Sequence, residues 1–226
     1  MIVRNWMTRD PMIVSSDTLV TDVERLLYEN NLRAVPVVDD GRLRGLISRA
    51  ICLRAVENAT RTQDQHEINY FVTRLKVKDL MVRNPVTVDI GDTMEYCLQT
   101  GQDTGVSQFP VLDNGKVVGI VSASEIFHLA ARMLGAWHDW SGITLAPRPL
   151  EKGTIGKIAS IVEATGANVH SLFSIRDTET PSAGHRVIIR FQDAPLMQVV
   201  ENLKTAGFEI FEAYEKRRGS GDGAVH

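Results

Sequence analysis

Ser107-Gln-Phe-Pro-Val-Leu-Asp-Asn-Gly-Lys-Val-Val-Gly-Ile-Val-Ser-Ala-Ser-Glu125 repeats, without a gap, the pattern of Arg33-Ala-Val-Pro-Val-Val-Asp-Asp-Gly-Arg-Leu-Arg-Gly-Leu-Ile-Ser-Arg-Ala-Ile51. In both stretches, an apolar run is followed by a turn, a second apolar run and a Ser. Asn114-Gly115 is among the strongest short signals for a two-residue hairpin turn, because both residues tolerate positive φ. Each stretch therefore predicts a β-hairpin that leads into a helix opened by the Ser.

The duplication extends upstream of both hairpins. Between residues 3–48 and 77–122, 11 of 46 aligned pairs are identical, whereas average amino-acid usage would give about 3. In each copy, apolar residues at helical spacing follow a short strand near Val14 or Val88. Each copy therefore predicts the order β-α-β-β-α. The identical residues, numbered in the first copy, are Val3, Met7, Arg9, Pro11, Val14, Pro36, Val37, Asp39, Gly41, Gly45 and Ser48.

The repeat also sets the expected domain boundaries. One copy is too short to bury much surface by itself. We therefore expect the two copies, residues 1–60 and 77–135, to pack against each other. Residues 61–76 between them read as a polar linker followed by a short helix over residues 68–75.

The C-terminal third, residues 140–216, has a different pattern. Gly153 precedes an amphipathic helix, Gly166 is a candidate C-cap, and Pro195 suits the first turn of a second helix. The resulting order β-α-β-β-α-β implies a ferredoxin-like sandwich, so the whole chain is of the α/β (α+β) class. The Gly-rich tail, residues 217–226, predicts disorder. The expected strands are residues 143–146, 168–176, 186–191 and 208–214.

Composition excludes several function classes. The 226 residues are 43% hydrophobic and 23% charged, as in an ordinary globular protein. A net charge of −3 gives no reason to expect nucleic acid or an anionic membrane as a partner. No apolar stretch approaches the roughly 18 residues of a membrane span, and the start of the chain lacks a signal-peptide pattern. We therefore expect a cytoplasmic protein.

The repeats resemble a pair of cystathionine-β-synthase-type (CBS) domains over roughly residues 1–135. The resemblance rests on residues 84–88, 109–113 and 119–122 with the acidic Glu125, and on the matching residues 10–14, 35–39 and 45–48 of the first copy. It implies a CBS-domain pair that binds an adenosine nucleotide (AMP, ADP, ATP or a related compound) between the repeats. The nucleotide would be a regulatory ligand, with no required cofactor.

In the second copy, a Ser and a carboxylate three residues later can bond ribose hydroxyls. Ser122 and Glu125 also form a capping-box pattern, in which both side chains satisfy helix amides. These two roles do not exclude each other, and both remain open at this point. The resemblance assigns the nucleotide site to Val86, Thr87, Ser107, Gln108, Phe109, Ser122 and Glu125.

The first copy predicts a second, weaker nucleotide site. Its acidic position holds Ile51, which cannot bond a ribose. Arg33 and Arg49 are able to meet a phosphate, although each also fits a solvated surface position. The two sites should therefore differ, with at most one strong nucleotide per chain. The weaker site comprises Ile13, Val14, Arg33, Val35, Ser48 and Arg49.

The C-terminal domain resembles an ACT regulatory domain, although the usual Asp-x-Pro-Gly-like turn is here residues 150–153, Leu-Glu-Lys-Gly. An effector carboxylate would meet helix-terminal amides near Glu151, Gly153, Thr154 and Asn168. Alternatively, Gly153 serves only the turn. Apolar character by itself places Phe109, Phe173, Phe191 and Phe208 in the cores.

The sequence gives little support for catalysis. The six His show no metal-ligand spacing, so no metal site is expected, and neither Cys52 nor Cys97 lies in a nucleophile motif. A CBS pair followed by an ACT-like domain is similar to acetoin-utilisation (AcuB-type) regulatory proteins. We therefore predict a non-catalytic regulatory sensor that forms a homodimer and acts on an enzyme target, in acetoin or central carbon metabolism. The alternative is a ligand-free dimerisation or interaction scaffold that docks on an enzyme partner.

Overall fold

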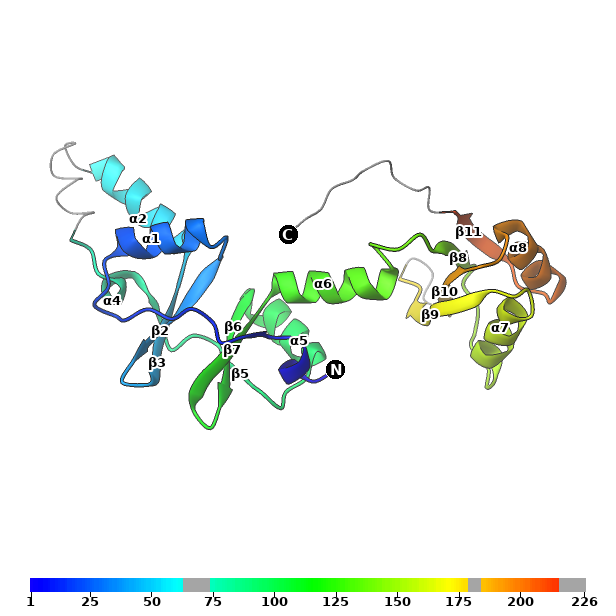
Figure 1. Cartoon of the computed structure of the whole chain (residues 1–226), viewed down its shortest axis with the longest axis horizontal. Helices are drawn as coiled ribbons and strands as arrows, with labels where there is room; N and C mark the ends of the chain where they lie inside the picture. The colour runs from blue at the N-terminus through cyan, green and yellow to red at the C-terminus, as the bar shows by residue number, and fades with distance from the viewer. Residues whose placement is uncertain (63–73, 179–183, 216–226) are drawn as a thin grey trace. The chain divides into compact units, whose positions relative to one another are not determined.

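The computed structural model describes residues 1–62, 74–178 and 184–215 (Figure 1). The chain divides into two compact units, Met1–Leu129 and Ala130–His226. The first unit contains both β-α-β-β-α copies apart from the end of the last helix, and the second contains the ferredoxin-like pattern. The predicted polar linker and short helix over residues 61–75 lie largely outside the described residues, as does the predicted tail.

The first copy forms the predicted helix, hairpin and second helix. Its hairpin turns at Asp40 and Gly41, whose φ values are +50° and +72°, as a two-residue turn of this kind requires. The predicted strand near Val14 is only a single parallel bridge from Val14 to Val37. The elements are α1 (Val20–Glu29), β2 (Ala34–Asp39), β3 (Arg42–Ser48) and α2 (Arg49–Thr62).

The second copy repeats this plan. Asn114 and Gly115 form the predicted turn, with φ of +49° and +78°. The hydroxyl of Thr93 caps the first helix by accepting a hydrogen bond of 3.1 Å from the Tyr96 amide. The elements are β5 (Val88–Asp89), α5 (Met94–Thr104), β6 (Gln108–Asp113), β7 (Lys116–Ser122) and α6 (Ala123–Leu134).

The two copies exchange their N-terminal segments, which the sequence did not predict. The first copy begins with η1 (Val3–Asn5) and β1 (Thr8–Arg9), and β1 pairs with β7 of the second copy. The second copy begins with α4 (Val77–Leu80) and β4 (Val82–Arg83), and β4 pairs with β3 of the first copy. Each of the sheets β1-β7-β6-β5 and β2-β3-β4 therefore contains a strand from the other copy.

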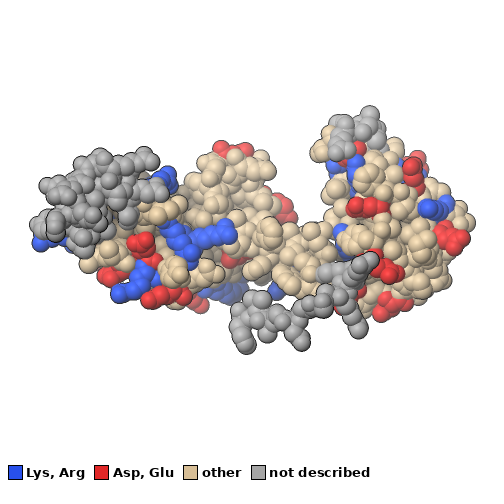
Figure 2. Space-filling model, turned by 90° about the horizontal axis from the view of Figure 1, so that it is seen from above, with Lys and Arg blue, Asp and Glu red and all other residues tan. Residues whose placement is uncertain are grey.

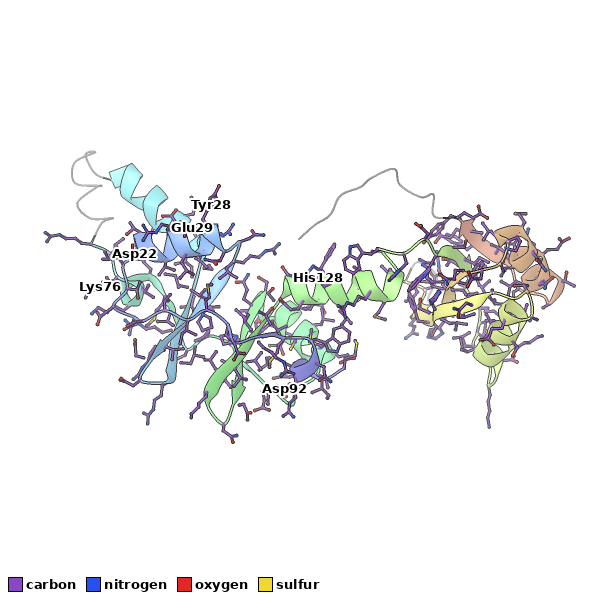
Figure 3. All side chains as sticks on the ribbon, viewed as in Figure 1. Asp22, Tyr28, Glu29, Lys76, Asp92 and His128 are labelled. Atoms are coloured by element: carbon purple, nitrogen blue, oxygen red, sulfur yellow. The ribbon has the colours of Figure 1, made fainter. Side chains whose placement is uncertain are left out.

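Each copy has a small core completed by the exchanged segment. Val77 is fully buried in the core of the first copy, and Val3 is fully buried in that of the second. The amide of Val3 also donates a hydrogen bond of 2.8 Å to the carbonyl of Asp92. Asp92 is labelled beside η1 in Figure 3. The two copies are thus held together by buried apolar side chains and by strand pairing.

The second unit is a four-stranded antiparallel sheet with the strand order β11-β8-β10-β9. Helices α7 and α8 lie on the same face of this sheet (Figure 1). The predicted ferredoxin-like arrangement is therefore confirmed. Phe191 and Phe208 are in its core as predicted, whereas Phe173 is half-buried. The elements are β8 (Ser141–Leu145), α7 (Thr154–Glu163), β9 (Asn168–Arg176), β10 (His185–Gln192), α8 (Leu196–Thr205) and β11 (Ile210–Tyr214).

The surface in Figure 2 carries positive and negative side chains interspersed on each unit. Within the described part of the chain, no helix has the length and apolar character needed to cross a membrane.

Candidate functional site

A cavity of about 250 Å³ lies in the first unit where the two copies meet. The first copy contributes β1 and the loop between α1 and β2, and the second contributes β6, β7 and the first turn of α6. We call this cavity the Glu125 pocket. It is lined by Thr8, Asn31, Leu32, Arg33, Ala34, Gln108, Ile120, Ser122, Ser124 and Glu125.

Three hydrogen bonds fix the Glu125 carboxylate at the edge of this pocket. Its Oε2 accepts from the Ser122 amide at 2.7 Å and from the Ser122 hydroxyl at 2.5 Å. Its Oε1 accepts from the Thr8 hydroxyl at 2.9 Å. The Ser124 amide donates to the Ser122 hydroxyl at 3.1 Å, which completes the capping box of α6. Glu125 therefore caps its helix and lines the pocket at the same time.

The chemistry of the pocket suits a polyhydroxylated ligand with an apolar part. An ionised carboxylate accepts about four hydrogen bonds, and three are present at Glu125. A ligand hydroxyl can donate to the remaining position, or replace the Thr8 hydroxyl. The apolar side chains of Leu32, Ala34 and Ile120 offer a surface for a planar ring.

The equivalent positions on the other side of the repeat are chemically different. The repeat offset of 74 residues makes Val82 the equivalent of Thr8, and Ile51 the equivalent of Glu125. Helix α2 keeps its cap, because the Ile51 amide donates to the Ser48 hydroxyl at 3.4 Å. The hydroxyl–carboxylate pair of one side is thus replaced by two apolar side chains on the other.

The structure separates the residues predicted for the stronger nucleotide site. Gln108, Ser122 and Glu125 line the Glu125 pocket. Phe109 is 1% exposed and packs in the core of the second copy, where its apolar character alone would place it. Val86 packs partly buried against that same core. Phe109 and Val86 are therefore not among the residues that line the pocket.

Two other residues of that set lie outside the pocket. The carbonyl of Ser107 accepts a hydrogen bond of 3.0 Å from the Ala123 amide, which fixes the start of β6 against α6. Thr87 lines a second cavity, of about 830 Å³, at the two hairpin turns. That cavity is lined by Asp40, Gly41, Arg42, Leu43, Asn84, Pro85, Thr87, Leu112, Asn114, Gly115 and Lys116.

The two cavities described here, both lined by residues that the structure describes, contain only Arg33 of the residues predicted for the weaker site. Arg33 lines the Glu125 pocket instead. Val14 and Val35 are buried in the core of the first copy, whereas Ile13 is 52% exposed. Strand alternation explains this split, because neighbouring residues point to opposite faces. Ser48 acts as the cap already described.

Arg49 donates hydrogen bonds within the first copy. Its Nη2 donates a hydrogen bond of 2.5 Å to the carbonyl of Leu27 and lies 3.5 Å from the side-chain oxygen of Asn31. The guanidinium therefore supports the end of α1 and the pocket-lining loop after it. Its contact with a phosphate stays a prediction.

The predicted effector residues of the C-terminal domain are divided between the two ends of α7. Glu151, Gly153 and Thr154 form the turn before the helix, in which the Thr154 amide donates to the Glu151 carbonyl at 3.1 Å. Asn168 starts β9, after the helix. A helix of 10 residues is about 15 Å long at 1.5 Å per residue. The four residues therefore do not form one cluster within the single chain, and the effector site stays a prediction.

Sequence reasoning missed six of the ten pocket residues, namely Thr8, Asn31, Leu32, Ala34, Ile120 and Ser124. Thr8 belongs to the exchanged segment, and a two-residue strand gives no periodic signal. The identity of Met7 with Met81 and of Gly45 with Gly119 was the available signal, since these residues mark where the segments cross. Asn31 has positive φ (+50°) in the turn after α1, which only its residue type hints at.

Other chemistry is sparse in the described part of the chain. Burial raises the pKa of the Cys52 and Cys97 thiols to about 11, so neither is a ready nucleophile. Over residues 1–62, 74–178 and 184–215, no group of three or more His, Cys, Asp or Glu side chains is placed to hold a metal ion.

Comparison with known proteins identifies the first unit. The CBS domain family model matches residues 3–58 and 77–132. A CBS domain-containing protein of Dictyostelium discoideum is 29% identical over 136 residues, which are 59% of this chain and 93% of that protein. The uncharacterised protein MJ1225 of Methanocaldococcus jannaschii is 24% identical over 131 residues, or 55% of this chain. These residues span only 45% of the length of MJ1225.

Solved structures agree on the fold. The structure of MJ1225 has a TM-score of 0.50 at 24% identity and covers 57% of this chain and 48% of that one. A Vibrio cholerae structure described as that of an acetoin utilization protein (AcuB) has a TM-score of 0.51 at 21% identity, covering 61% of this chain and 95% of that one. Residues 3–58 and 77–132 of this chain are therefore a tandem pair of CBS domains.

Proposed function

We propose that the CBS pair is a regulatory module that binds an adenosine nucleotide in the Glu125 pocket. The observation that carries this proposal is the Glu125 carboxylate, which is held by Thr8 of the first copy and Ser122 of the second. A ribose presents adjacent hydroxyl donors, which a fixed carboxylate accepts as charge-assisted hydrogen bonds. The resemblance of the repeats to CBS domains supports an adenosine ligand.

In the proposed complex, the adenine ring lies against Leu32, Ala34 and Ile120, and the ribose faces Glu125. The neutral polar groups of Asn31 and Gln108 are available to the edge of the base. Because the apolar Ile51 and Val82 occupy the equivalent positions of the first copy, we expect one strongly bound ligand per chain. Two sites of equal affinity would contradict this asymmetry.

The pocket is suited to regulation because both copies line it. A ligand that touches β1 and the α1–β2 loop as well as α6 is sensitive to how the copies pack. It shifts the packing only if it binds one arrangement more tightly than another. We propose that the ferredoxin-like domain, which resembles ACT domains, modulates or transmits this signal to an enzyme target. The resemblance to AcuB-type proteins supports acetoin or central carbon metabolism as the setting.

We also propose that the chain forms a homodimer through helices of the CBS pair. Leu53 of α2 and Phe127 of α6 occupy equivalent positions in the two copies, and their exposed fractions are 56% and 77%. Large exposed apolar side chains at matching positions of two helices are typical of a surface that a partner covers. A second copy presents the same pair of helices and therefore fits by symmetry.

Substitution of Glu125 tests the nucleotide site. Glu125→Gln keeps an acceptable capping-box residue but removes the charge, so we expect an unchanged melting temperature and a weakened ligand. Glu125→Ala removes both functions and should also destabilise α6 by about 0.5–2 kcal/mol. Thermal shift with AMP measures both effects, and Glu201→Ala, on the exposed face of α8 in the other unit, is the control. Equal AMP-induced shifts in wild type and Glu125→Gln would contradict the proposal.

A further inference from the structure

The charge of the Glu125 pocket limits the class of ligands that the pocket can accept. Among its ten lining residues, only Arg33 and Glu125 carry a formal charge, and their charges are opposite. The other polar groups on the lining are hydroxyls and amides, which form hydrogen bonds but do not neutralise an anion. The lining as a whole is therefore neutral.

A second cation, Arg49, contacts the lining residue Asn31 but is not itself on the lining. Arg49 donates through Nη2 to the Leu27 carbonyl. Releasing it toward a ligand would leave the Leu27 carbonyl without this donor. Arg33, which is exposed just before β2, is thus the cation that the lining offers to a bound anion.

The size of the pocket also favours a ligand with few phosphate groups. Its volume of about 250 Å³ lies below the range of about 300–1,000 Å³ that is usual for small-molecule sites. A nucleoside therefore occupies most of the available space. In the proposed complex, further groups on its 5′ position extend outward toward Arg33, which is exposed.

We propose, on the basis of the function proposed above, that this pocket selects adenosine ligands with at most one phosphate group. A terminal phosphate carries about −1.5 to −2 charges at pH 7, and the single positive charge of Arg33 offsets about one half to two thirds of this charge. Each further phosphate adds negative charge that no lining residue neutralises, while the Glu125 carboxylate repels it. ADP and ATP are therefore disfavoured relative to AMP and adenosine.

Isothermal titration of the full chain with adenosine, AMP, ADP and ATP in magnesium-free buffer tests this selectivity. We expect adenosine and AMP to bind, and ADP and ATP to bind at least about tenfold more weakly, which corresponds to about 1.4 kcal/mol. ADP or ATP binding as tightly as AMP would overturn the selectivity but leave the proposed nucleotide site intact. No binding by any of the four compounds would overturn both.

Two variants separate charge from size. Arg33→Gln should lower the affinity for AMP and leave that for adenosine unchanged, because only the phosphate needs the cation. Ser124→Arg adds a cation to the lining at a residue that is given no contact with the base, and should raise the affinity for ATP relative to adenosine. The melting temperature of each variant reports whether it is folded. Unchanged ATP-to-adenosine ratios in a folded Ser124→Arg protein would contradict the role given to charge.

Discussion

Two glycines show at the residue scale why the duplication kept certain identities. A Cβ atom on Gly45 would lie 2.7 Å from the sulfur of Met81 and 2.7 Å from the carbonyl oxygen of Val82. Gly119 faces Met7 and Thr8 of the other segment in the same way. The pair Met81 and Gly45 and the pair Met7 and Gly119 thus mark two equivalent crossing points. At each of them, the exchanged segment of one copy lies close to the glycine backbone of the other.

Gly45→Ala should therefore loosen the pairing of β4 with β3. The backbone oxygen of Val82 cannot move as a flexible side chain can, so we expect a loss of about 1–3 kcal/mol, as is usual for overpacking. Urea unfolding followed by circular dichroism measures this loss. Gly156→Ala is the matched control, because a Cβ at this helical position meets nothing within 4 Å and should stabilise α7 by about 1 kcal/mol. Equal stability of wild type and Gly45→Ala would contradict the crossing-point interpretation.

Individual residues were predictable from the sequence where local chemistry decides their role. Asn114 and Gly115 form the expected turn because few residues tolerate positive φ. Ser122 and Glu125 form the expected cap because the pattern acts within one helical turn. The inward direction of Arg49 was not predictable, because its acceptor is the carbonyl of Leu27, a distant residue that the sequence pattern does not connect to it.

At the scale of elements, the exchanged segments are tied down by charge as well as by strand pairing. The ammonium groups of Lys76 and Lys78, at the start of α4 in the second copy, lie 3.0 Å and 2.8 Å from the Asp17 carboxylate of the first copy. Lys76 is labelled in Figure 3. The two ammonium groups lower the pKa of Asp17 from 3.8 to about 2. The ionised form of Asp17 therefore favours the folded arrangement.

This depressed pKa predicts a pH window. The contribution of Asp17 to stability is fully present above its ordinary pKa and is lost as the pH falls from about 4 to about 2. Asp17→Asn should thus lower the free energy of unfolding slightly at neutral pH, with the difference from wild type shrinking in that window and at high salt. Urea titrations at pH 7, 4, 3 and 2 measure the difference. If the difference in free energy of unfolding between wild type and Asp17→Asn stayed constant down to pH 2, it would not come from the charge of Asp17.

The long, periodic elements agreed with the sequence, whereas the short ones did not. The hairpins and the two helices of the C-terminal domain carry alternating or helical patterns that burial enforces. The two-residue strands β1 and β4 are too short to carry a pattern, so their pairing with the other copy was not predictable. For the same reason, the predicted site did not include Thr8.

At the scale of the whole molecule, a homodimer through α2 and α6 predicts a charge-sensitive interface. Phe127→Glu places a carboxylate on a side chain position that is 77% exposed in the single chain, so its fold should be unaffected. Burying that carboxylate against a second copy is costly, and the dimer should dissociate. Light scattering coupled to size exclusion measures the mass. A variant that remains dimeric would exclude this helix face as the interface.

Duplication explains the regulatory character that we propose for the molecule. In the repeat alignment, Thr8 and Glu125 of the Glu125 pocket correspond to the apolar residues Val82 and Ile51. The sequence predicted part of this difference through Ile51 and Glu125. It did not predict that Arg33 would line the Glu125 pocket, because that requires the first copy's loop to face the second copy's helix.

A crystal structure of the full chain with bound AMP would show directly whether the nucleotide binds in the Glu125 pocket. We expect one nucleotide per chain in this pocket. Its ribose hydroxyls should lie within hydrogen-bond distance of the Glu125 carboxylate, and its adenine ring should lie against Leu32, Ala34 and Ile120. Density for AMP at the hairpin cavity lined by Arg42 and Lys116, or beside Ile51, with the Glu125 pocket empty, would contradict it.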